Sequence, residues 1–563
     1  MKKVIYLIIT ILIFVQISCN IKRAPDIHFE VSPFIKDSIS SMKIKAIFKA
    51  NDSGLTMLSF QNNAWGEDSL YNCLSNLRLT KGVGEIIKNP DSNRIEIKHT
   101  KNLDYIEFEY TLHQDTELPL NSKKTYRPII QPEYFSIFSH NLFMIPDHLA
   151  NESSTAMNIK IDWKDFPENY TIHNSFGSNQ RVQELTVEKD KFHSAVFVGG
   201  DYKIHPINIQ KNKVYLATRG DWVTFQDSTI VNLLGKTITA QRNFWKDHSQ
   251  EYFTITMLPF PMKNGSSFQG TGLTNSFAIS ASNNAYLEIE GLAYLFNHEL
   301  MHNWIGHNIQ NANEEEQYWF SEGFTDYYTI KNIASNRILG LDEAFFIDEF
   351  NKIIANLHVS SVKEAPNSEI NYENFWSNWD YEKLPYRRGA IFAFYLDHKI
   401  RKDSSGRFNL NDLMLAFLDD ARNKNQKIDH PYFIKRVNSF LNDDIKPFFD
   451  KHIVNGKLMD LKAIFEDFEF EFIPTAEVFY RGYELDLKTR LISNVDIASN
   501  AYKAGMRDGD KALSVSVYSD PKKEATFKLL RGKKELQITF FPAKEIQAPQ
   551  LIFNKKNIKN LHF

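Results

Sequence analysis

Apolar and polar side chains alternate along much of residues 26–220. In 105–113 every second residue is apolar, and 41–49 repeats the alternation around Lys43, Lys45 and Ile47. A period of two predicts strands with one buried face, and turn-forming residues at 89–93 separate two such runs. The pattern predicts an N-terminal antiparallel β domain, a sandwich or saddle, over 26–220. We identify no cluster of His, Cys, Asp and Glu in this region that indicates a site.

From residue 221 onward the apolar side chains are spaced three or four positions apart in longer segments. Residues 231–244 fit a helix, whereas 252–259 and 277–280 fit strands. At 563 residues the chain exceeds what one hydrophobic core usually organises. We therefore predict a multidomain α+β protein. Its expected parts after the β domain are a catalytic region (221–335), a helical continuation of it (336–472), a strand-rich module (474–543) and a basic tail (544–563).

Two histidines four positions apart stand in the sequence NHELMH at 297–302. On a helix, His298 and His302 project from the same face, and Glu299 adjoins the first of them. A catalytic zinc ion takes three protein ligands and keeps one open position, and neutral imidazole and carboxylate are suitable ligands. An ordinary buried helix that happens to contain two histidines remains the alternative for this motif alone.

A third ligand is predicted from a second helix around 318–328. Glu322 follows His302 by 20 positions, enough for the chain to return to the metal. Asp326 lies one helical turn beyond Glu322, where its carboxylate can accept the outward N–H of a metal-bound histidine. A solvated acid on an acidic stretch is the alternative for Glu322.

The segment 298–304 (HELMHNW), followed by 319–324 (WFSEGF), resembles the gluzincin metallopeptidases and, among them, the glycyl aminopeptidase family. The resemblance implies an N-terminal β domain, a thermolysin-like catalytic domain with a helical bundle, and a PDZ-like C-terminal module. It also implies one Zn²⁺ per chain held by His298, His302 and Glu322. In that setting Glu299 would take a proton from the zinc-bound water and deliver it to the leaving amine.

Two further segments match the gluzincin pattern. Tyr386, within KLPYRRGA at 383–390, is similar to a tyrosine that begins a helix in that family and points at the metal, where a phenol can stabilise an oxyanion. A helix-entry aromatic is the alternative. Arg387 and Arg388, which follow it, are not assigned.

The other segment is the strand that lies along the substrate in gluzincin aminopeptidases. It corresponds here to a stretch whose expected substrate-binding residues are Gly272, Leu273, Thr274 and Asn275. Thr274 occupies the place of the glutamate that holds the substrate's free amino terminus. A hydroxyl offers no full negative charge to an ammonium group, so endopeptidase activity becomes an alternative to aminopeptidase activity. A simple turn at the glycines is the other interpretation.

Residues 499–510 (SNAYKAGMRDGD) resemble the turn of bacterial PDZ domains, which bind a peptide as an added strand. The loop that would bind a peptide carboxylate is not clearly preserved near 481–483. A structural cap over the catalytic domain is therefore an equal alternative for this module.

The N-terminal segment 1–18 has two lysines and then an apolar run, and Cys19 follows it. This resembles a bacterial lipoprotein signal, which predicts export to the cell envelope and a membrane anchor on Cys19 facing the periplasm or the cell surface. Plain secretion and a retained anchor are the alternatives. With Cys19 lipidated, Cys73 would be the one remaining thiol, which excludes an intrachain disulfide.

Composition narrows the function classes. The net charge of −3 argues against a nucleic-acid-binding protein, and the composition is that of an ordinary globular chain. The sequence predicts a zinc metallopeptidase acting on peptides. Three alternatives remain: an endopeptidase of the same fold, a non-catalytic peptide-binding surface lipoprotein, and a hydrolase of a non-peptide such as an epoxide. Oligomeric state cannot be read from the sequence.

Overall fold

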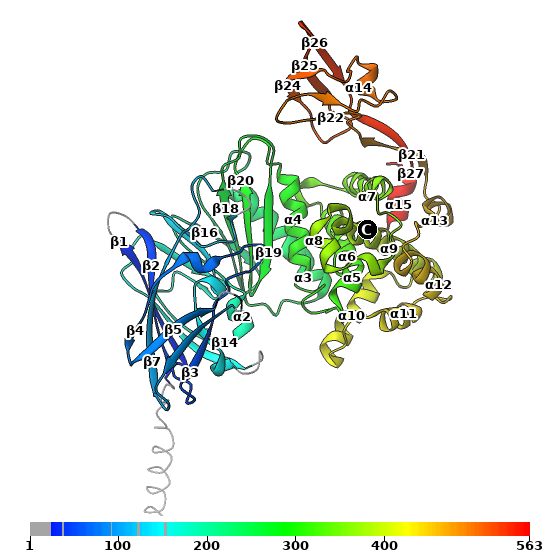
Figure 1. Cartoon of the computed structure of the whole chain (residues 1–563). Helices are drawn as coiled ribbons and strands as arrows, with labels where there is room; N and C mark the ends of the chain where they lie inside the picture. The colour runs from blue at the N-terminus through cyan, green and yellow to red at the C-terminus, as the bar shows by residue number, and fades with distance from the viewer. Residues whose placement is uncertain (1–23, 36–38, 90, 92, 121–123, 151–154) are drawn as a thin grey trace, which may run out of the picture. The chain divides into compact units, whose positions relative to one another are not determined.

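The computed structural model describes residues 24–35, 39–89, 91, 93–120, 124–150 and 155–563. The chain divides into two compact units. The first contains the described residues of Met1–Asp227 together with Gln250–Leu287, and the second contains Ser228–Ser249 and Glu288–Phe563. Figure 1 shows strands dominating the first unit and helices dominating most of the second.

The first unit contains three sheets built from the alternating sequence. The six-stranded sheet has the order β14 (Val182–Glu188), β11 (Ala156–Trp163), β1 (Ile27–Ile35), β2 (Ile39–Lys49), β7 (Tyr105–His113), β4 (Leu74–Lys81). The four-stranded sheet has the order β10 (Ile145–Pro146), β3 (Leu55–Ser59), β6 (Arg94–His99), β5 (Gly84–Asn89). The five-stranded sheet has the order β13 (Gly177–Ser178), β12 (Thr171–Asn174), β15 (Val196–Gly200), β9 (Tyr134–Phe138), β8 (Ile129–Ile130), and a short helix α2 (Lys189–His193) precedes β15.

The predicted alternation places the apolar residues of β2 and β7 on one buried face. The two strands are antiparallel, with Ile44 opposite Tyr110 and Ala46 opposite Phe108, and all four side chains are buried. The prediction of an N-terminal antiparallel β domain is confirmed for this sheet, with one exception. β1 and β11 pair in parallel, because more than a hundred residues separate them and no hairpin connects them.

A fourth sheet of the first unit crosses the predicted domain boundary at residue 220. Its order is β16 (Lys203–Ile209), β17 (Asn212–Thr218), β18 (Tyr252–Phe260), β20 (Ser276–Ser282), β19 (Phe268–Leu273). β18 pairs with β17 in parallel, and β20 then pairs with β18 in parallel. Ladder hydrogen bonds therefore join 250–287 to the β unit, although the sequence pattern changes at 221.

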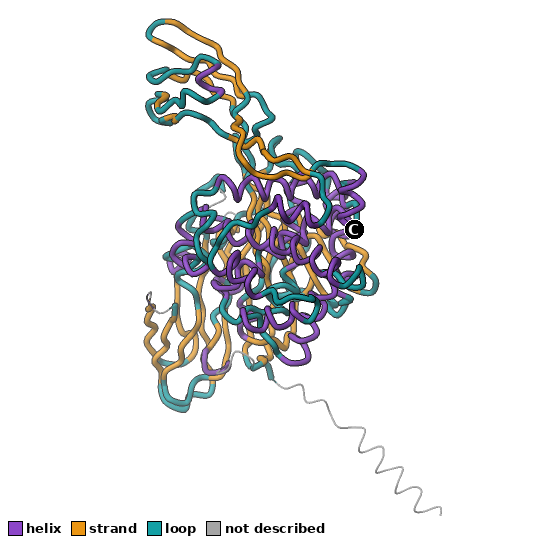
Figure 2. Tube along the Cα trace, turned by 90° about the vertical axis from the view of Figure 1, so that its right-hand side faces the viewer, coloured by secondary structure: helices purple, strands orange, loops and turns teal. Residues whose placement is uncertain are grey.

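Most of the second unit is built from helices, drawn in purple in Figure 2. They pack around a large apolar core. The helices of this core are α3 (Asp227–Trp245), α4 (Ile289–Met301), α5 (Glu314–Ser321), α6 (Gly323–Ser335), α7 (Glu343–Val359), α8 (Tyr372–Ser377), α9 (Trp379–Asp403), α10 (Leu410–Lys424), α11 (His430–Asn438), α12 (Lys446–Phe449) and α13 (Leu461–Asp467). α6 packs against α4, α7 and α9, and α5 packs against α9. Helix α6, which is buried along nearly its whole length, is thus the centre of the bundle.

The C-terminal part of the second unit contains a separate small core around Tyr483, Met506 and Phe527. Its strands and helix are β22 (Glu484–Leu485), β23 (Ile492–Ser493), α14 (Asn500–Lys503), β24 (Lys511–Ser516), β25 (Ala525–Arg531) and β26 (Lys534–Phe540). β21 (Phe472–Phe479) and β27 (Ala543–Leu551) form an antiparallel pair that enters and leaves this module.

The segment predicted as a basic tail, 544–563, is folded. It contains β27 and helix α15 (Lys555–Leu561), and Asn351 on α7 donates a hydrogen bond to the carbonyl of Leu551 at 2.9 Å. The lysines of this segment suggested a tail, whereas its apolar residues Leu551 and Leu561 are buried in the helical core.

The predicted signal segment 1–18 and Cys19 lie outside the described residues. Among the helices that the structure describes, none combines the length and the apolar character needed to cross a membrane. Cys73 is buried, and burial raises the pKa of its thiol to about 12, which keeps it protonated and unreactive.

Candidate metal centre

Helix α4 carries both histidines of the predicted motif. Leu292, Phe296 and Leu300 bury one face of the helix, and His298 and His302 project beside that face. Their Nε2 atoms lie 3.2 Å apart. His302 ends the helix, and its Nδ1 lies 3.0 Å from the carbonyl of Ile305, which fixes the ring with Nε2 directed at His298.

Glu322 reaches the same point from the junction of α5 and α6. The sequence predicted one helix here, and the structure has two, which meet at Glu322. One carboxylate oxygen, Oε2, lies 3.3 Å from His298 Nε2 and 3.5 Å from His302 Nε2. Three donor atoms with these separations share a common point about 2 Å from each, which is the usual Zn–N and Zn–O distance.

Two residues behind His298 hold its ring. Asp326 Oδ1 accepts a hydrogen bond from His298 Nδ1 at 2.9 Å, so Nε2 is left to face the cluster. The hydroxyl of Tyr294 donates to Asp326, and its ring stacks on His298 with centroids 6.5 Å apart. Asp326 was predicted from the sequence, whereas Tyr294 was not, although its position one helical turn before His298 could have indicated it.

The electrostatics of the cluster favour positive charge at its centre. Burial lowers the pKa of His298, but hydrogen bonds to Asp326 and Glu322 outweigh it and raise the pKa to about 10. Burial raises the pKa of Glu322, yet the two imidazoles hold it well below its usual range. Such a set of groups binds either protons or a divalent cation, and two histidines with one carboxylate are a donor set suited to Zn²⁺.

Glu299 and Tyr386 lie next to this cluster. Burial raises the pKa of Glu299, which suits a group that must take a proton near neutral pH. The Tyr386 ring stacks on His298 at 5.9 Å, and burial followed by the charge of Glu322 raises the pKa of its phenol well above the ordinary value. A phenol with a raised pKa stays protonated and can donate a hydrogen bond.

The sequence predicted that Tyr386 begins a helix. In the structure it lies in the second turn of α9. Asn378 caps the helix by accepting a hydrogen bond from Asp380 N, so α9 begins at Trp379 and includes Pro385. Gly389, one turn after Tyr386, lies against Gly323, the residue after Glu322. This backbone contact between α9 and α6 positions the phenol beside the carboxylate.

The predicted substrate segment, Gly272, Leu273, Thr274 and Asn275, belongs to the first unit. β19 ends at Leu273, and Thr274 with Asn275 forms the turn into β20. β19 is the last strand of its sheet in the described part of the chain. An edge strand is the arrangement that a peptide needs to add as a further strand.

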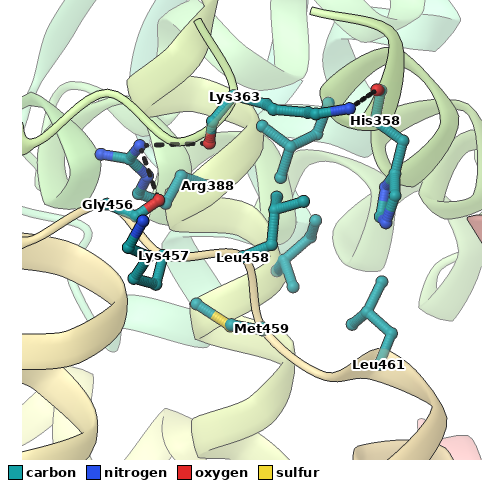
Figure 3. A pocket seen from close by; sticks show the side chains of 10 residues that line it. His358, Lys363, Arg388, Gly456, Lys457, Leu458, Met459 and Leu461 are labelled. Carbon is teal, nitrogen blue, oxygen red and sulfur yellow. Dashed lines mark hydrogen bonds between the residues drawn. The ribbon is translucent and has the colours of Figure 1, made fainter.

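The two unassigned arginines have different surroundings. Arg388 is buried, and its Nη2 donates to the carbonyls of Lys363, at 3.4 Å, and Gly456, at 3.5 Å (Figure 3). It also donates to the carbonyl of Ala365 at 2.6 Å. The cavity beside it has a volume of about 10 Å³, room for about one water molecule. Arg388 therefore holds loops together and does not meet a substrate. Arg387 donates to the carbonyl of Asn356 at 3.2 Å.

A second grouping of candidate ligands, not predicted from the sequence, lies on the first unit. His28 Nε2 is 2.7 Å from Asp162 Oδ2, and Glu30 is close by on β1. Lys160 contacts Asp162 at 3.0 Å and Lys164 contacts Glu30 at 2.5 Å. The two lysines neutralise the two carboxylates, so this grouping is an ion-pair network on the sheet surface.

Comparison with known proteins agrees with this geometry. Residues 265–452 match the model of the peptidase family M1 domain. Leucine aminopeptidase 2 of Pyricularia oryzae is 26% identical over 118 residues, and leucine aminopeptidase 2 of Ajellomyces capsulatus is 28% identical over 127 residues. Each alignment covers 20% of this chain and 18% of the relative, so the chain matches under a fifth of the length of these curated relatives.

A solved structure is similar over nearly the whole chain. The crystal structure of an aminopeptidase N family protein from Idiomarina loihiensis matches with a TM-score of 0.68 at 16% identity, covering 95% of this chain and 99% of that one. The predictions of a multidomain α+β architecture and of a gluzincin aminopeptidase-like fold are confirmed. The sequence resemblance was narrower, to the glycyl aminopeptidases, whereas the family model that matches is that of peptidase family M1.

Proposed function

We propose that this chain, whose residues 265–452 match a peptidase family M1 domain, is a zinc-dependent peptidase that hydrolyses peptide bonds in an aminopeptidase-like manner. The observation that carries the proposal is the convergence of His298, His302 and Glu322 on one point, with Glu299 and Tyr386 beside it. The predicted hydrolase class and zinc dependence agree with the family match.

In this proposal His298, His302 and Glu322 hold one Zn²⁺ per chain. The bound ion supplies Lewis acidity and lowers the pKa of a coordinated water to about 7. Asp326 keeps His298 in the tautomer that presents Nε2 to the ion, and Tyr294 keeps Asp326 in place.

The protein's own groups move the proton and stabilise the charge. Glu299 takes the proton of the attacking water on its carboxylate and gives it to the nitrogen of the leaving amine. Tyr386 donates a hydrogen bond from its phenol to the oxygen that becomes negative when the carbonyl is attacked. The raised pKa of both groups supports these roles, since Glu299 can hold the proton between the two steps and Tyr386 remains a donor.

A direct test is the Glu299→Gln variant. It should bind zinc with the stoichiometry of the wild type and hydrolyse a mixed peptide pool at least about a thousandfold more slowly. Metal analysis and cleavage mapping by mass spectrometry measure the two properties separately. Wild-type turnover by Glu299→Gln would contradict the assigned role, and zinc binding without turnover by the wild type would favour a non-catalytic peptide-binding protein.

Endopeptidase activity on the same fold is the second candidate, favoured by Thr274 at the place of an amine-binding glutamate. Peptides with free amino termini and their acetylated counterparts distinguish the two activities. Faster cleavage of the free-amine series supports the aminopeptidase, and equal rates support the endopeptidase.

Export as a lipoprotein and a PDZ-like module complete the proposal. The lysines, apolar run and Cys19 of the N-terminal segment support an envelope location, and the turn at 499–510 supports the module. Radiolabelled palmitate incorporation, compared between the wild type and Cys19→Ser, tests the anchor. If the wild type incorporates no label, the lipid anchor is contradicted and plain secretion is favoured.

A further inference from the structure

We propose that three exposed aromatic side chains near the metal centre, Tyr372, Trp376 and Trp379, form an aromatic platform that binds an aromatic side chain of the peptide substrate. The inference rests on the proposed peptidase function and specifies the substrate class of that same site.

The exposure of these rings is unusual for the chain. Tyr372, Trp376 and Trp379 are 69%, 67% and 64% exposed, whereas five of the other six tryptophans are at most 8% exposed. Burying such rings against a ligand releases water from large apolar surfaces. Clustered exposed apolar side chains mark binding sites, and Trp and Tyr contribute most to binding energy at interfaces.

The three aromatic residues flank a break between two helices. Tyr372 and Trp376 lie one turn apart on α8, with ring centroids separated by 6.4 Å. α8 ends at Ser377, and the side chain of Asn378 caps the next helix at once, so that Trp379 begins α9. The cap fixes the backbone between Trp376 and Trp379, which lowers the entropy lost when a ligand orders this segment.

Trp379 is connected to the metal centre along α9. The ammonium of Lys383 lies 4.6 Å from the centre of the Trp379 ring and 4.6 Å from that of the Tyr386 ring. Tyr386 in turn stacks on His298 at 5.9 Å. Three contacts thus join the platform to a proposed zinc ligand.

Trp376 is connected to the same centre by a second route. Its ring meets Phe375 edge-on at 5.2 Å, and Phe375 stacks on Tyr318 at 4.5 Å. The carbonyl of Tyr318 accepts a hydrogen bond from the backbone N–H of Glu322 at 2.9 Å. Because the two routes end on different proposed ligands, the platform lies beside the metal centre.

The distance restricts which substrate residue can reach the platform. An extended peptide advances about 3.3 Å per residue, so the contacts between Trp379 and His298 correspond to fewer than about five residues. The bound side chain therefore lies within a few positions of the cleaved bond.

The chemistry of the platform favours an uncharged aromatic ring over a carboxylate. The cation that contacts it, Lys383, already lies over two ring faces and pairs with Glu382 at 2.6 Å. Offset or edge-on contacts with Trp and Tyr favour aromatic side chains over aliphatic ones of similar size.

The test uses the zinc-loaded full-length chain and a series of alanine-rich peptides. In each peptide one alanine, at one to four positions from the cleaved bond, is replaced by phenylalanine. We expect phenylalanine at one position to raise kcat/KM by about three- to tenfold. Combined Trp376→Ala and Trp379→Ala should bring that phenylalanine-to-alanine ratio close to 1. Tyr518→Ala, which removes an exposed aromatic from the C-terminal module, should leave the ratio unchanged.

The proposal is overturned if the double variant keeps the wild-type ratio, or if no position shows a preference for phenylalanine. A chain that cleaves none of the peptides contradicts the proposed peptidase function instead. In that case calorimetric titration of the phenylalanine and alanine peptides into Glu299→Gln, with and without the two tryptophan substitutions, still decides the platform. Equal affinities in all four titrations would refute it.

Discussion

Gly323 and Gly389 lie in direct contact where α6 crosses α9. A Cβ added to Gly389 would lie 2.8 Å from the Cα of Gly323, closer than real Cβ contacts allow. Glu322 precedes the first glycine, and Tyr386 stands one turn before the second. The absence of two side chains therefore sets the distance between a proposed zinc ligand and the proposed oxyanion donor.

Gly389→Ala should separate α6 from α9 and move both groups. Because the added methyl also meets the carbonyl of Trp319, we expect a loss of about 1–3 kcal/mol in the free energy of unfolding. A shift of about 1 Å at the site should reduce kcat/KM by up to about a hundredfold. Urea unfolding and peptide kinetics measure the two effects. Wild-type values in both would show that the helices can separate without cost.

Asp326→Asn should weaken zinc binding without unfolding the chain. An amide accepts the His298 N–H less strongly than a carboxylate, and loss of such a partner commonly costs about 10- to 100-fold in metal affinity. Competition with a chelating dye measures the zinc Kd. Asp348→Asn, an exposed acid on α7, is the matched control and should retain the wild-type affinity. If Asp326→Asn and Asp348→Asn bind zinc with the same Kd, Asp326 does not contribute to metal binding.

The metal cluster could be predicted because its information is local. Two histidines four apart on an apolar helix fix their own geometry, and Asp326 lies one turn from Glu322. Tyr294 follows from the same periodicity. The contacts between Gly323 and Gly389 could not be predicted, because they depend on how two helices 66 residues apart cross. The parallel pairing of β1 with β11 likewise depends on the tertiary fold and not on the alternation in either strand.

A buried ion pair in the helical core gives a further prediction. Lys331 contacts Asp397, and Asp397 also accepts hydrogen bonds from the Tyr327 hydroxyl at 2.7 Å and from Leu410 N at 3.1 Å. Burial lowers the pKa of Lys331, and the cations around Asp397 hold its pKa well below the usual range despite burial. Lys331→Met should cost about 3–5 kcal/mol, because it removes the closest positive charge to a buried carboxylate.

The double variant Lys331→Met with Asp397→Leu separates pairing from packing. The double variant has no unpaired buried carboxylate. Its unfolding free energy should therefore be higher than that of Lys331→Met. Chemical denaturation of the two proteins gives the comparison. A double variant less stable than the single one would show that Asp397 stabilises the core through Tyr327 and Leu410 instead.

The first unit should lose stability in acid because of buried neutral histidines. Burial lowers the pKa of His140 to about 4 and that of His193 to about 3, below the ordinary value of about 6.5. Below pH 6.5 these histidines bind protons in the unfolded chain but stay neutral in the folded chain. The unfolding free energy should therefore fall by about 1.4 kcal/mol per pH unit for each histidine until the folded pKa is reached.

Denaturant unfolding between pH 7 and pH 4 measures that slope. His140→Gln, which cannot be protonated in this range, should reduce it by about the contribution of one histidine. An unchanged slope in the variant would show that His140 does not contribute to the loss of stability in acid.

Thr274→Glu should increase the preference for a free amino terminus. Thr274 begins the turn after edge strand β19, and its backbone N–H donates to the carbonyl of Ser194 at 2.7 Å, so the backbone there is held. A carboxylate at this position would add a charge-assisted hydrogen bond to a substrate ammonium, of about 1.5–3 kcal/mol. We expect the ratio of kcat/KM for free-amine over acetylated peptides to rise by about tenfold or more. The glutamine of Thr274→Gln is as long as glutamate but uncharged, so this variant should keep a ratio near that of the wild type. If both variants give one ratio, the ammonium group does not bind at residue 274.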